Sequence, residues 1–446
     1  MKERAIAVFD IGKTNKKVVI FNEKMQVLFE EEQKFSEVTD DDGFECDDLD
    51  LIEEWLKIKV RELANSEKYN ITDINITTYG ATIVCLDENG KRITPAYNYL
   101  KPVDESIPES IYKRYGGRDE FCRRTASPAL GMLNSGMQLL WLKREKPEKF
   151  SRIKYVLHFP QYLSYIFTGK ICSEHTSIGC HTALWDFDTM SYHKWTETLG
   201  IGLPEPVPVE SSCNIEINGK NVRFGIGIHD SSASLAPYFT ASSGKFILLS
   251  TGTWCINMNP FNFEKLTADQ LDKDCLCYMS INRQPVKSSR LFLGHIHENG
   301  VNMLARHFKK DPDYYKKVQY DPDLALQINK LSTEKGFFFR ESPFDREFRD
   351  HIDFFQFKSF EAGYHHLMNE LGKLTLDSIR LILPEKDDIS IIYITGGFSK
   401  NSHFVNTIKD FFPDKKVYRS EISNSSALGA ALVISGLKPQ VNLGLL

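Results

Sequence analysis

Apolar and polar residues alternate along the chain in a way that predicts strands joined by tight turns, followed by helices. The first fifty residues hold three apolar runs separated by short polar segments, which predicts an antiparallel meander. These runs are Ala5–Phe9, Val18–Phe21 and Val27–Phe35. Apolar residues from Leu51 to Asn65 then follow a helical period, and Ile71–Thr78 returns to the pattern of a strand.

The middle of the chain repeats the opening pattern. Lys245–Asn259 sets an apolar strand, a small polar turn and a second apolar strand in the same order. Gly252 lies 240 residues after Gly12 and takes the same place in that pattern, which favours a fold of two similar halves. A helix near Phe360–Leu383 and a strand at Ile389–Thr395 complete the second half.

Composition narrows the class of protein. The chain has 446 residues, 41% of them apolar, and its 60 acidic and 55 basic side chains give a net charge of −5. Such a chain can bury large cores, and no basic stripe predicts nucleic-acid binding. No window reaches the ~20 apolar residues of a membrane span, and nine cysteines without a C-x-x-C pair fit a reducing compartment. We therefore expect a cytoplasmic protein that binds neither membranes nor nucleic acids.

Side chains suited to phosphate chemistry follow the first strand. Asp10 ends the apolar run, and Gly12, Thr14, Lys16 and Lys17 come within the next seven positions. Glycine in such a turn lets backbone N–H groups approach an anion, while hydroxyl and ammonium groups add donors. A neighbouring carboxylate suits hydrated Mg²⁺. The alternative is an ordinary hairpin turn with a capping aspartate.

Two more glycine turns follow apolar strands in the second half. Ser250–Trp254 sets Gly252 between hydroxyl residues, which offers donors without a competing charge. Gly396 and Gly397 follow the later strand, and Asn401 falls on the next predicted helix. Each could be ordinary packing by itself, but turns at matching places in two halves could hold one polyphosphate from both sides.

A candidate base lies between the halves. His229 and Asp230 stand at the end of an apolar stretch and the start of a predicted helix, which fits a general base with an orienting neighbour. The alternative is that Asp230 only caps the helix. No G-x-x-x-x-G-K-[ST] pattern occurs, so P-loop chemistry is not indicated.

In this order, the four motifs resemble those of the FGGY carbohydrate kinases of the actin/hexokinase-like ATPase superfamily, from about Ile6 to Ala431. The resemblance implies an α/β fold with two RNase H-like domains of the actin/hexokinase type and an interdomain cleft. It implies an N-terminal sugar-binding domain at 1–241 and a C-terminal nucleotide-binding domain at 242–446. It also implies ATP and Mg²⁺ as cofactors and a small-molecule sugar as substrate.

The resemblance further assigns roles to residues by their position in the motifs. The catalytic residues are Asp230, the base, and Asp10, which also lies beside the metal. The cofactor-binding residues are Gly12, Thr14, Asn15, Lys17, Gly252, Thr253, Gly300, Gly396, Gly397 and Asn401. The substrate-binding residues are Tyr79, Thr82, Asn134, His229 and Asp230.

Several details are similar to the rhamnulokinase and fuculokinase branch. Ser250–Trp254, Gly227–Asp230 and Leu133–Leu139 resemble the forms of these segments found in rhamnulokinases. The branch implies an ATP-dependent kinase for a primary hydroxyl, O1 of a 6-deoxy-ketose such as L-rhamnulose or L-fuculose. Thr82 stands where the branch usually has aspartate, so a kinase for another pentulose or polyol stays open, as does a nucleotide-binding sensor without catalysis. The oligomeric state, with a homodimer among the options, is open too.

Overall fold

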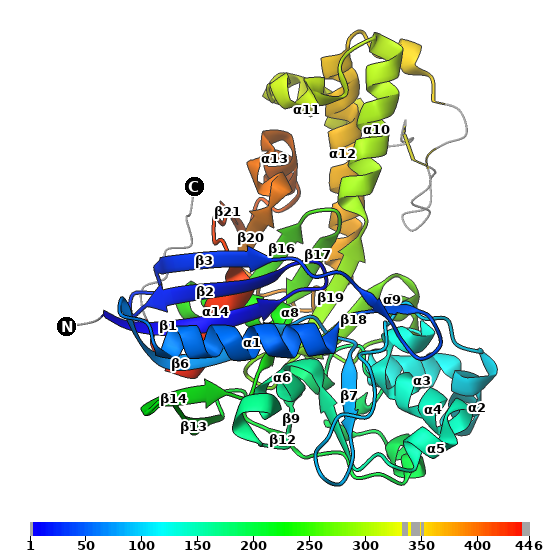
Figure 1. The fold of residues 1–446 in the computed structure, drawn as a ribbon. Helices are drawn as coiled ribbons and strands as arrows, with labels where there is room; N and C mark the ends of the chain where they lie inside the picture. The colour runs from blue at the N-terminus through cyan, green and yellow to red at the C-terminus, as the bar shows by residue number, and fades with distance from the viewer. Residues whose placement is uncertain (1–2, 332–337, 340–347, 349–351, 439–446) are drawn as a thin grey trace.

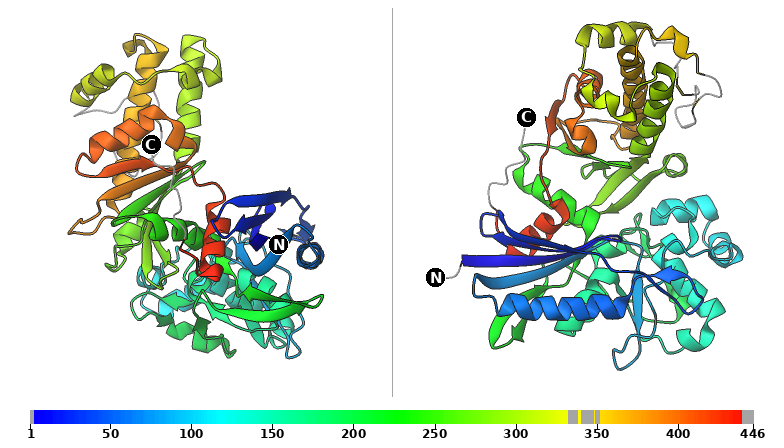
Figure 2. Two further views of the ribbon diagram at one scale, coloured as in Figure 1. Left: turned by 90° about the vertical axis from the view of Figure 1, so that its left-hand side faces the viewer. Right: turned by 45° about the horizontal axis from the view of Figure 1, so that its top comes forward.

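The computed structural model describes residues 3–331, 338, 339, 348 and 352–438. Two mixed β-sheets, each with its own helices, form the two halves of the molecule (Figures 1 and 2). The sequence prediction of an α/β fold is therefore confirmed. Within the described ranges, no helix is both long enough and apolar enough to cross a membrane.

The first sheet has seven strands in the order β13-β14-β6-β1-β2-β3, with β15 pairing separately to β6. Its strands are β1 (Glu3–Ile11), β2 (Lys16–Asn22), β3 (Val27–Gln33), β6 (Tyr69–Thr78), β13 (Ser212–Ile217), β14 (Lys220–Gly225) and β15 (Ile228–His229). Strands β1, β2 and β3 are antiparallel, which confirms the predicted meander. Strand β6 runs parallel to both β1 and β15.

The second sheet has six strands in the order β18-β19-β17-β16-β20-β21. They are β16 (Phe246–Thr251), β17 (Cys255–Asn259), β18 (Cys275–Met279), β19 (Pro285–Leu291), β20 (Ile391–Gly396) and β21 (Lys416–Arg419). Strand β16 is antiparallel to β17 and parallel to β20, just as β1 is antiparallel to β2 and parallel to β6. Gly12 and Gly252 each stand at the start of the turn in the corresponding hairpin, so the predicted internal repeat is confirmed.

Helices cover both sheets and form two projections (Figure 1). They are α1 (Leu49–Ala64), α2 (Ser106–Arg114), α3 (Arg118–Thr125), α4 (Ser135–Glu145), α5 (Pro147–Phe150), α6 (Phe159–Thr168), α7 (His175–Ile178), α8 (Asp230–Ala241), α9 (Ala268–Asp272), α10 (Leu293–Phe308), α11 (Pro322–Leu331), α12 (Phe360–Arg380), α13 (Ser402–Phe411) and α14 (Ser425–Ser435). Helices α2 to α5 gather at one end of the first sheet, and α10 to α12 rise from the second. The predicted helix at 51–65 begins earlier, at Leu49, because the Asp48 side chain accepts a hydrogen bond from Leu51 N–H.

Short elements complete the description. The small strands are β4 (Val38–Thr39), β5 (Glu45–Cys46), β7 (Ile83–Leu86), β8 (Tyr155–His158), β9 (Ser173–Glu174), β10 (Trp185–Asp186), β11 (Ser191–Tyr192) and β12 (Pro206–Val207). The short 3-10 helices are η1 (Gly131–Leu133), η2 (Lys194–Leu199), η3 (Pro312–Lys317), η4 (Phe354–Gln356) and η5 (Gly397–Lys400). All nine cysteines are free thiols, as the scattered spacing predicts.

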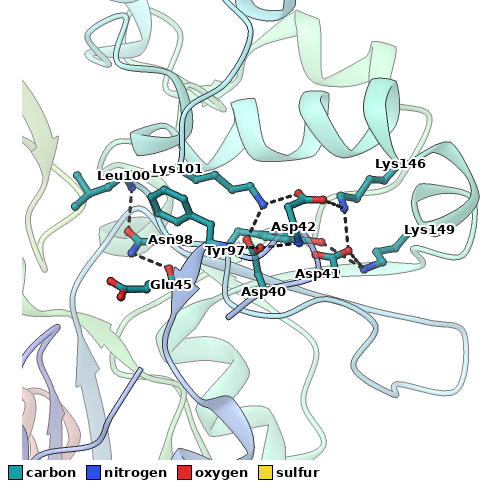
Figure 3. A network of polar contacts seen from close by, with 11 residues as sticks. Asp40, Asp41, Asp42, Glu45, Tyr97, Asn98, Leu100, Lys101, Lys146 and Lys149 are labelled. Atoms are coloured by element: carbon teal, nitrogen blue, oxygen red, sulfur yellow. Dashed lines mark hydrogen bonds and ion pairs between the residues drawn. The ribbon is translucent and has the colours of Figure 1, made fainter. Parts of the chain in front are cut away.

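The acidic loop before α1 is held by three lysines from residues 101–149, the part of the chain that contains helices α2 to α5 (Figure 3). Lys101 Nζ lies 2.6 Å from Asp40 Oδ2, and Lys149 Nζ lies 2.6 Å from Asp41 Oδ2. Lys146 Nζ contacts the carboxylates of both Asp41 and Asp42. These pairs neutralise three neighbouring carboxylates and attach the loop to the end of α4 and to α5, so the cluster is a structural link.

Helices α8 and α14 cross between the two sheets. Ala233 of α8 and Ala430 of α14 belong to one buried cluster with Ile6 and Val8 of β1. The other side of α8 packs on the second sheet, where Leu235 shares a cluster with residues of β16 and β20. The last helix of the chain thus packs on the first sheet, and the boundary between 241 and 242 stays a prediction.

The crossing of α8 and α14 depends on a close backbone approach at Gly429. A Cβ at this position would lie 1.8 Å from the Ala233 carbonyl oxygen, so Gly429→Ala must push the helices apart. We expect the free energy of unfolding, measured by urea denaturation, to fall by at least ~2 kcal/mol, since overpacking typically costs 1–3 kcal/mol. Gly202→Ala is the control, because no atom lies within 4 Å of its added Cβ. Equal stability of the two variants would contradict this account of the crossing.

Candidate active site

Three parallel strands of the first sheet end at the same edge and bring the predicted chemistry together. In the register of β1 and β6, Asp10 lies opposite Thr77, and in that of β15 and β6, His229 lies opposite Thr78. Asp230 begins α8 directly after β15, and Tyr79 follows β6. The carboxyl ends of parallel strands meet at one edge, so residues far apart in the sequence become neighbours.

Asp10 lies in an environment that favours its protonated form more than water does. Burial raises its pKa to about 6, and the negative charge of Asp230 acts in the same direction. A hydrogen bond of 2.6 Å from Ser426 Oγ at the start of α14, together with the charge of Lys17, opposes the rise. The Coulombic effect of Asp230 on Asp10 shows that the structure brings the two predicted carboxylates together.

Asp230 is the second carboxylate of this edge. Burial raises its pKa to about 6, against hydrogen bonds from Ser231 N–H (2.5 Å) and Ser231 Oγ (3.1 Å) to Oδ1. Asp230 is the first residue of α8, and His229 occupies the N-cap position without a side-chain capping bond. Asp230 therefore does not serve as the N-cap of α8, which leaves its second oxygen for other partners.

The turn between β1 and β2 carries the first predicted phosphate site. Gly12 N–H donates to the Asn15 carbonyl oxygen over 2.9 Å and closes the turn, while Thr14 is exposed. Lys17 lies opposite Asp10 in the strand register, so both side chains share one face of the sheet. The structure thus distinguishes the two lysines, because Lys16 points to the other face and is buried.

The second sheet repeats this arrangement with glycines. The carboxyl ends of β16 and β20 meet, with Thr251 opposite Gly396. Gly396 has a φ of +83°, and a Cβ there would lie 1.8 Å from the Thr251 carbonyl oxygen, so only glycine fits this approach. A cavity of about 540 Å³ opens beside these strand ends, and its lining includes Gly252, Gly397 and Asn401.

Aromatic residues form much of the rest of this cavity. Tyr364 and His297 line it, and the Asn401 amide donates to Tyr364 Oη over 2.9 Å while its oxygen caps α13. A neighbouring cavity of about 400 Å³ shares Gly252 with the first and adds Thr253. Gly300 lines neither of these two cavities, because it is buried in α10 against the side chain of Leu367.

A hydrogen bond joins the segments that hold the predicted sugar-binding residues. Gln138 of α4 donates to the Ala81 carbonyl oxygen over 2.9 Å and so ties the segment of Asn134 to that of Tyr79 and Thr82. The Asn134 amide donates to the Pro128 carbonyl oxygen, and its own oxygen has no hydrogen-bond partner within the described part of the chain. These contacts hold the segment of Asn134 beside that of Tyr79 and Thr82.

Comparison with known proteins agrees with this geometry. Residues 5–211 match the N-terminal domain of the FGGY family of carbohydrate kinases. The fold matches a carbohydrate kinase from Novosphingobium aromaticivorans with a TM-score of 0.80 and 23% identity, over 99% of this chain and 93% of that one. The matched part of the chain, residues 5–211, belongs to the FGGY family.

Other FGGY-type structures share the fold at lower identity. Xylulose kinase from Lactobacillus acidophilus matches with a TM-score of 0.75 and 16% identity, over 97% of this chain and 89% of that one. Glycerol kinase from Plasmodium falciparum, solved with ADP, matches with a TM-score of 0.70 and 16% identity, over 98% and 90%. These likenesses confirm the fold expected of the family.

Among curated proteins, this FGGY member resembles rhamnulokinases over part of their length. It is 24% identical to that of Oceanobacillus iheyensis over 286 residues, 61% of this chain and 59% of the relative. It is 27% identical to that of Mannheimia succiniciproducens over 197 residues, 42% of this chain and 40% of the relative. The matched parts therefore amount to about half the length of these relatives.

One polar network of this FGGY member did not follow from the sequence. Asp47, in the loop before α1, accepts hydrogen bonds from Lys16 Nζ (2.9 Å), Lys13 Nζ (2.9 Å) and Tyr79 Oη (2.5 Å). It neutralises Lys16 and holds Tyr79 beside the strand ends. Asp47 is one of several aspartates in its loop, and no local pattern distinguishes it from the others.

Lys16 and Lys17 are neighbours with opposite surroundings, which makes them a matched pair for a stability test. The Lys16 and Asp47 side chains are 2% and 5% exposed, whereas Lys17 is 26% exposed and pairs with exposed glutamates. Lys16→Met should lower the free energy of unfolding by about 2–3 kcal/mol, less than the usual 3–5, because Lys13 and Tyr79 still bond Asp47. Lys17→Met should cost under ~1 kcal/mol. Thermal and urea unfolding measure both, and an equal loss would contradict the assignment.

Proposed function

We propose that this FGGY-family chain is an ATP-dependent kinase that phosphorylates O1 of a ketose, with a 6-deoxy-ketose such as L-rhamnulose or L-fuculose as substrate. The observation that carries the proposal is the meeting of Asp10 and Asp230 at one strand edge. One carboxylate can face the nucleotide phosphates and the other the acceptor hydroxyl. Similarity to rhamnulokinases over part of the chain supports the choice of sugar.

The cavity beside the second sheet is the proposed adenosine site. Its glycines allow a flat ring to lie against the backbone, and Tyr364 supplies an apolar face. The turns that begin at Gly12 and Gly252 would direct other backbone N–H groups toward the phosphates, because the N–H groups of the two glycines donate within the turns. The ADP in the glycerol kinase structure supports a nucleotide as a ligand of this fold.

The residues at the first strand edge fit a divalent cation. Asp10 is a hard oxygen ligand, and the nearby charge of Asp230 makes a positive ion favourable there. We propose that Asp10 holds Mg²⁺ through its carboxylate and that Lys17 lies alongside the same phosphates. When bound, the ion would offset the charge on the phosphate oxygens.

Asp230 is the proposed base. As O1 bonds to the γ-phosphorus, the bond from phosphorus to the bridging oxygen breaks, and ADP leaves with that electron pair. The proton of the hydroxyl passes to the Asp230 carboxylate. Phosphoryl transfer needs mainly alignment and charge stabilisation, so a base that takes the proton late is sufficient. With a pKa near 6, Asp230 is mostly ionised at neutral pH and is a better acceptor than an aspartate in water.

A second candidate within the same reaction is a kinase for another pentulose or a polyol. Thr82 supports it, since this buried residue offers a neutral hydroxyl where a charged contact to the sugar is usual in the branch. A catalytically inactive nucleotide sensor is a further alternative, but two neighbouring carboxylates whose charged forms are disfavoured by burial would be a cost without use to a binding protein.

A substrate panel tests the proposal directly. L-rhamnulose, L-fuculose, xylulose, ribulose and glycerol are each offered with ATP and Mg²⁺, and ADP release is measured by a coupled assay. We expect a 6-deoxy-ketose to give kcat/KM at least about tenfold above xylulose and ribulose, which lack the C6 methyl group, since one methyl group in an apolar pocket is worth ~1–3 kcal/mol. Preference for another sugar would favour the second candidate, and no turnover with any of them would favour the sensor.

Replacing the base separates binding from chemistry. Asp230→Asn keeps the size and polarity of the side chain but cannot accept the proton, so kcat should fall by a factor of about 10²–10⁴. The dissociation constant for ATP, measured by calorimetry, should stay within about threefold of the wild type. Asp188→Asn is the control, because Asp188 pairs with Arg123 on the helical projection, away from the strand edge. If Asp230→Asn keeps more than a tenth of wild-type turnover, Asp230 is not the base.

A further inference from the structure

The neighbour of the proposed base lies in an unusually well-defined hydrogen-bond chain. His229 is 4% exposed, and its Nδ1 lies 3.2 Å from Ser232 Oγ, one turn along α8. Ser232 Oγ in turn donates to the Met279 carbonyl oxygen over 2.7 Å. This hydrogen-bond chain therefore runs from the first sheet, through α8, to the end of β18 in the second sheet.

The single proton of the Ser232 hydroxyl fixes the tautomer of His229. That proton must lie between Ser232 Oγ and the Met279 carbonyl, because two oxygens 2.7 Å apart require a hydrogen between them. The hydroxyl can then only accept from His229, so Nδ1 carries the ring proton. Burial lowers the pKa of His229 to about 4, so the ring is neutral and Nε2 bears a lone pair.

This lone pair faces the base. His229 Nε2 lies 3.3 Å from Asp230 Oδ1, farther than the Ser231 donors of the same oxygen at 2.5 and 3.1 Å. A longer separation is expected when two acceptors face each other. Beside the same nitrogen, Gly80 approaches so closely that a Cβ there would lie 3.1 Å from Nε2. The ring is thus held in place against Asp230.

We propose that His229 is a positioning residue whose Nε2 accepts a hydrogen bond from Asp230 once Asp230 has taken the proton of the sugar hydroxyl. The inference rests on the proposed role of Asp230 as base. The proton leaves the hydroxyl oxygen as the oxygen–phosphorus bond forms and comes to rest between Oδ1 and Nε2. An acceptor that faces Asp230 raises the pKa of its carboxyl group and so makes Asp230 a stronger base. A donor in the same place would lower that pKa.

Other titratable groups near the pair are accounted for. Burial holds the pKa of His158 and His181 well below the usual range, and that of Cys180 and Tyr278 well above it, so all four stay uncharged near neutral pH. The groups facing Asp230 are Asp10, Tyr99, Cys180 and Tyr278, and those facing His229 are His158, His181 and Tyr278. Of these, Asp10 titrates in the same range as Asp230, and it has no contact with Ser232 among the described interactions.

Ser232→Ala tests the tautomer by its effect on the base. Without the hydroxyl, Nδ1 loses its acceptor, and the tautomer with Nε2–H becomes favoured because it can donate to the Asp230 carboxylate. The acid limb of log(kcat/KM) against pH, near 6 in the wild type, should then move to lower pH by about one unit, with a lower kcat on the plateau. Ser232→Thr retains a hydroxyl and should keep the wild-type limb.

Ser234→Ala is the matched control, because Ser234 lies on the same helix and its hydroxyl donates only to the Ser231 carbonyl oxygen. It should leave the pH profile unchanged. If Ser232→Ala folds with the wild-type limb, or moves the limb to higher pH, the proposal is wrong.

A second measurement depends on neither turnover nor the stability of the serine variant. Nitrogen-15 NMR of the wild-type protein, with His229→Gln used for assignment, should show a protonated Nδ1 and an unprotonated Nε2. A protonated Nε2 would overturn the proposal even if sugar phosphorylation is confirmed. The expected tautomer together with no turnover on any sugar would instead reject the proposed function and leave the hydrogen-bond chain established.

Discussion

The parallel pairing of β6 with β1 and β15 is the constraint on which the active site depends. Parallel strands end at the same edge, and this pairing makes neighbours of Asp10 and Asp230, which are 220 positions apart in the chain. The pairing of β16 with β20 does the same for Gly252 and Gly397. Each half thus assembles half of a site from ends of strands, and the proposed chemistry needs both.

Burial gives this arrangement its chemical character. Two carboxylates in water would both be ionised far below neutral pH, but here burial raises the pKa of each to about 6. The hydrogen bond from Ser426 limits the rise at Asp10, and the Ser231 donors limit it at Asp230. The result is a pair of carboxylates that can take up or release a proton near neutral pH, as the proposed phosphoryl transfer requires of its base.

The sequence alone predicted much of the fold, because its strands and glycine turns are strongly patterned. The meander, the internal repeat and the position of Asp230 at a helix start all follow from local periodicity and are confirmed. Local pattern could not reveal Asp47 or Ser426, since their partners lie in other elements and depend on how the elements pack. Position in a motif also gave no warning that Gly300 is buried against Leu367. The roles of the site residues stay predictions, because each role depends on where a ligand binds, and the fold alone does not show this.

The contact between Ser426 and Asp10 joins the first strand of the chain to its last helix. During synthesis on a ribosome, the serine that donates to Asp10 is made 416 residues after it. A growing chain can therefore form its first sheet early, yet it lacks the finished surroundings of Asp10 until α14 emerges. Translation order therefore delays the final electrostatic environment of Asp10 until the helix that follows the second sheet has been made.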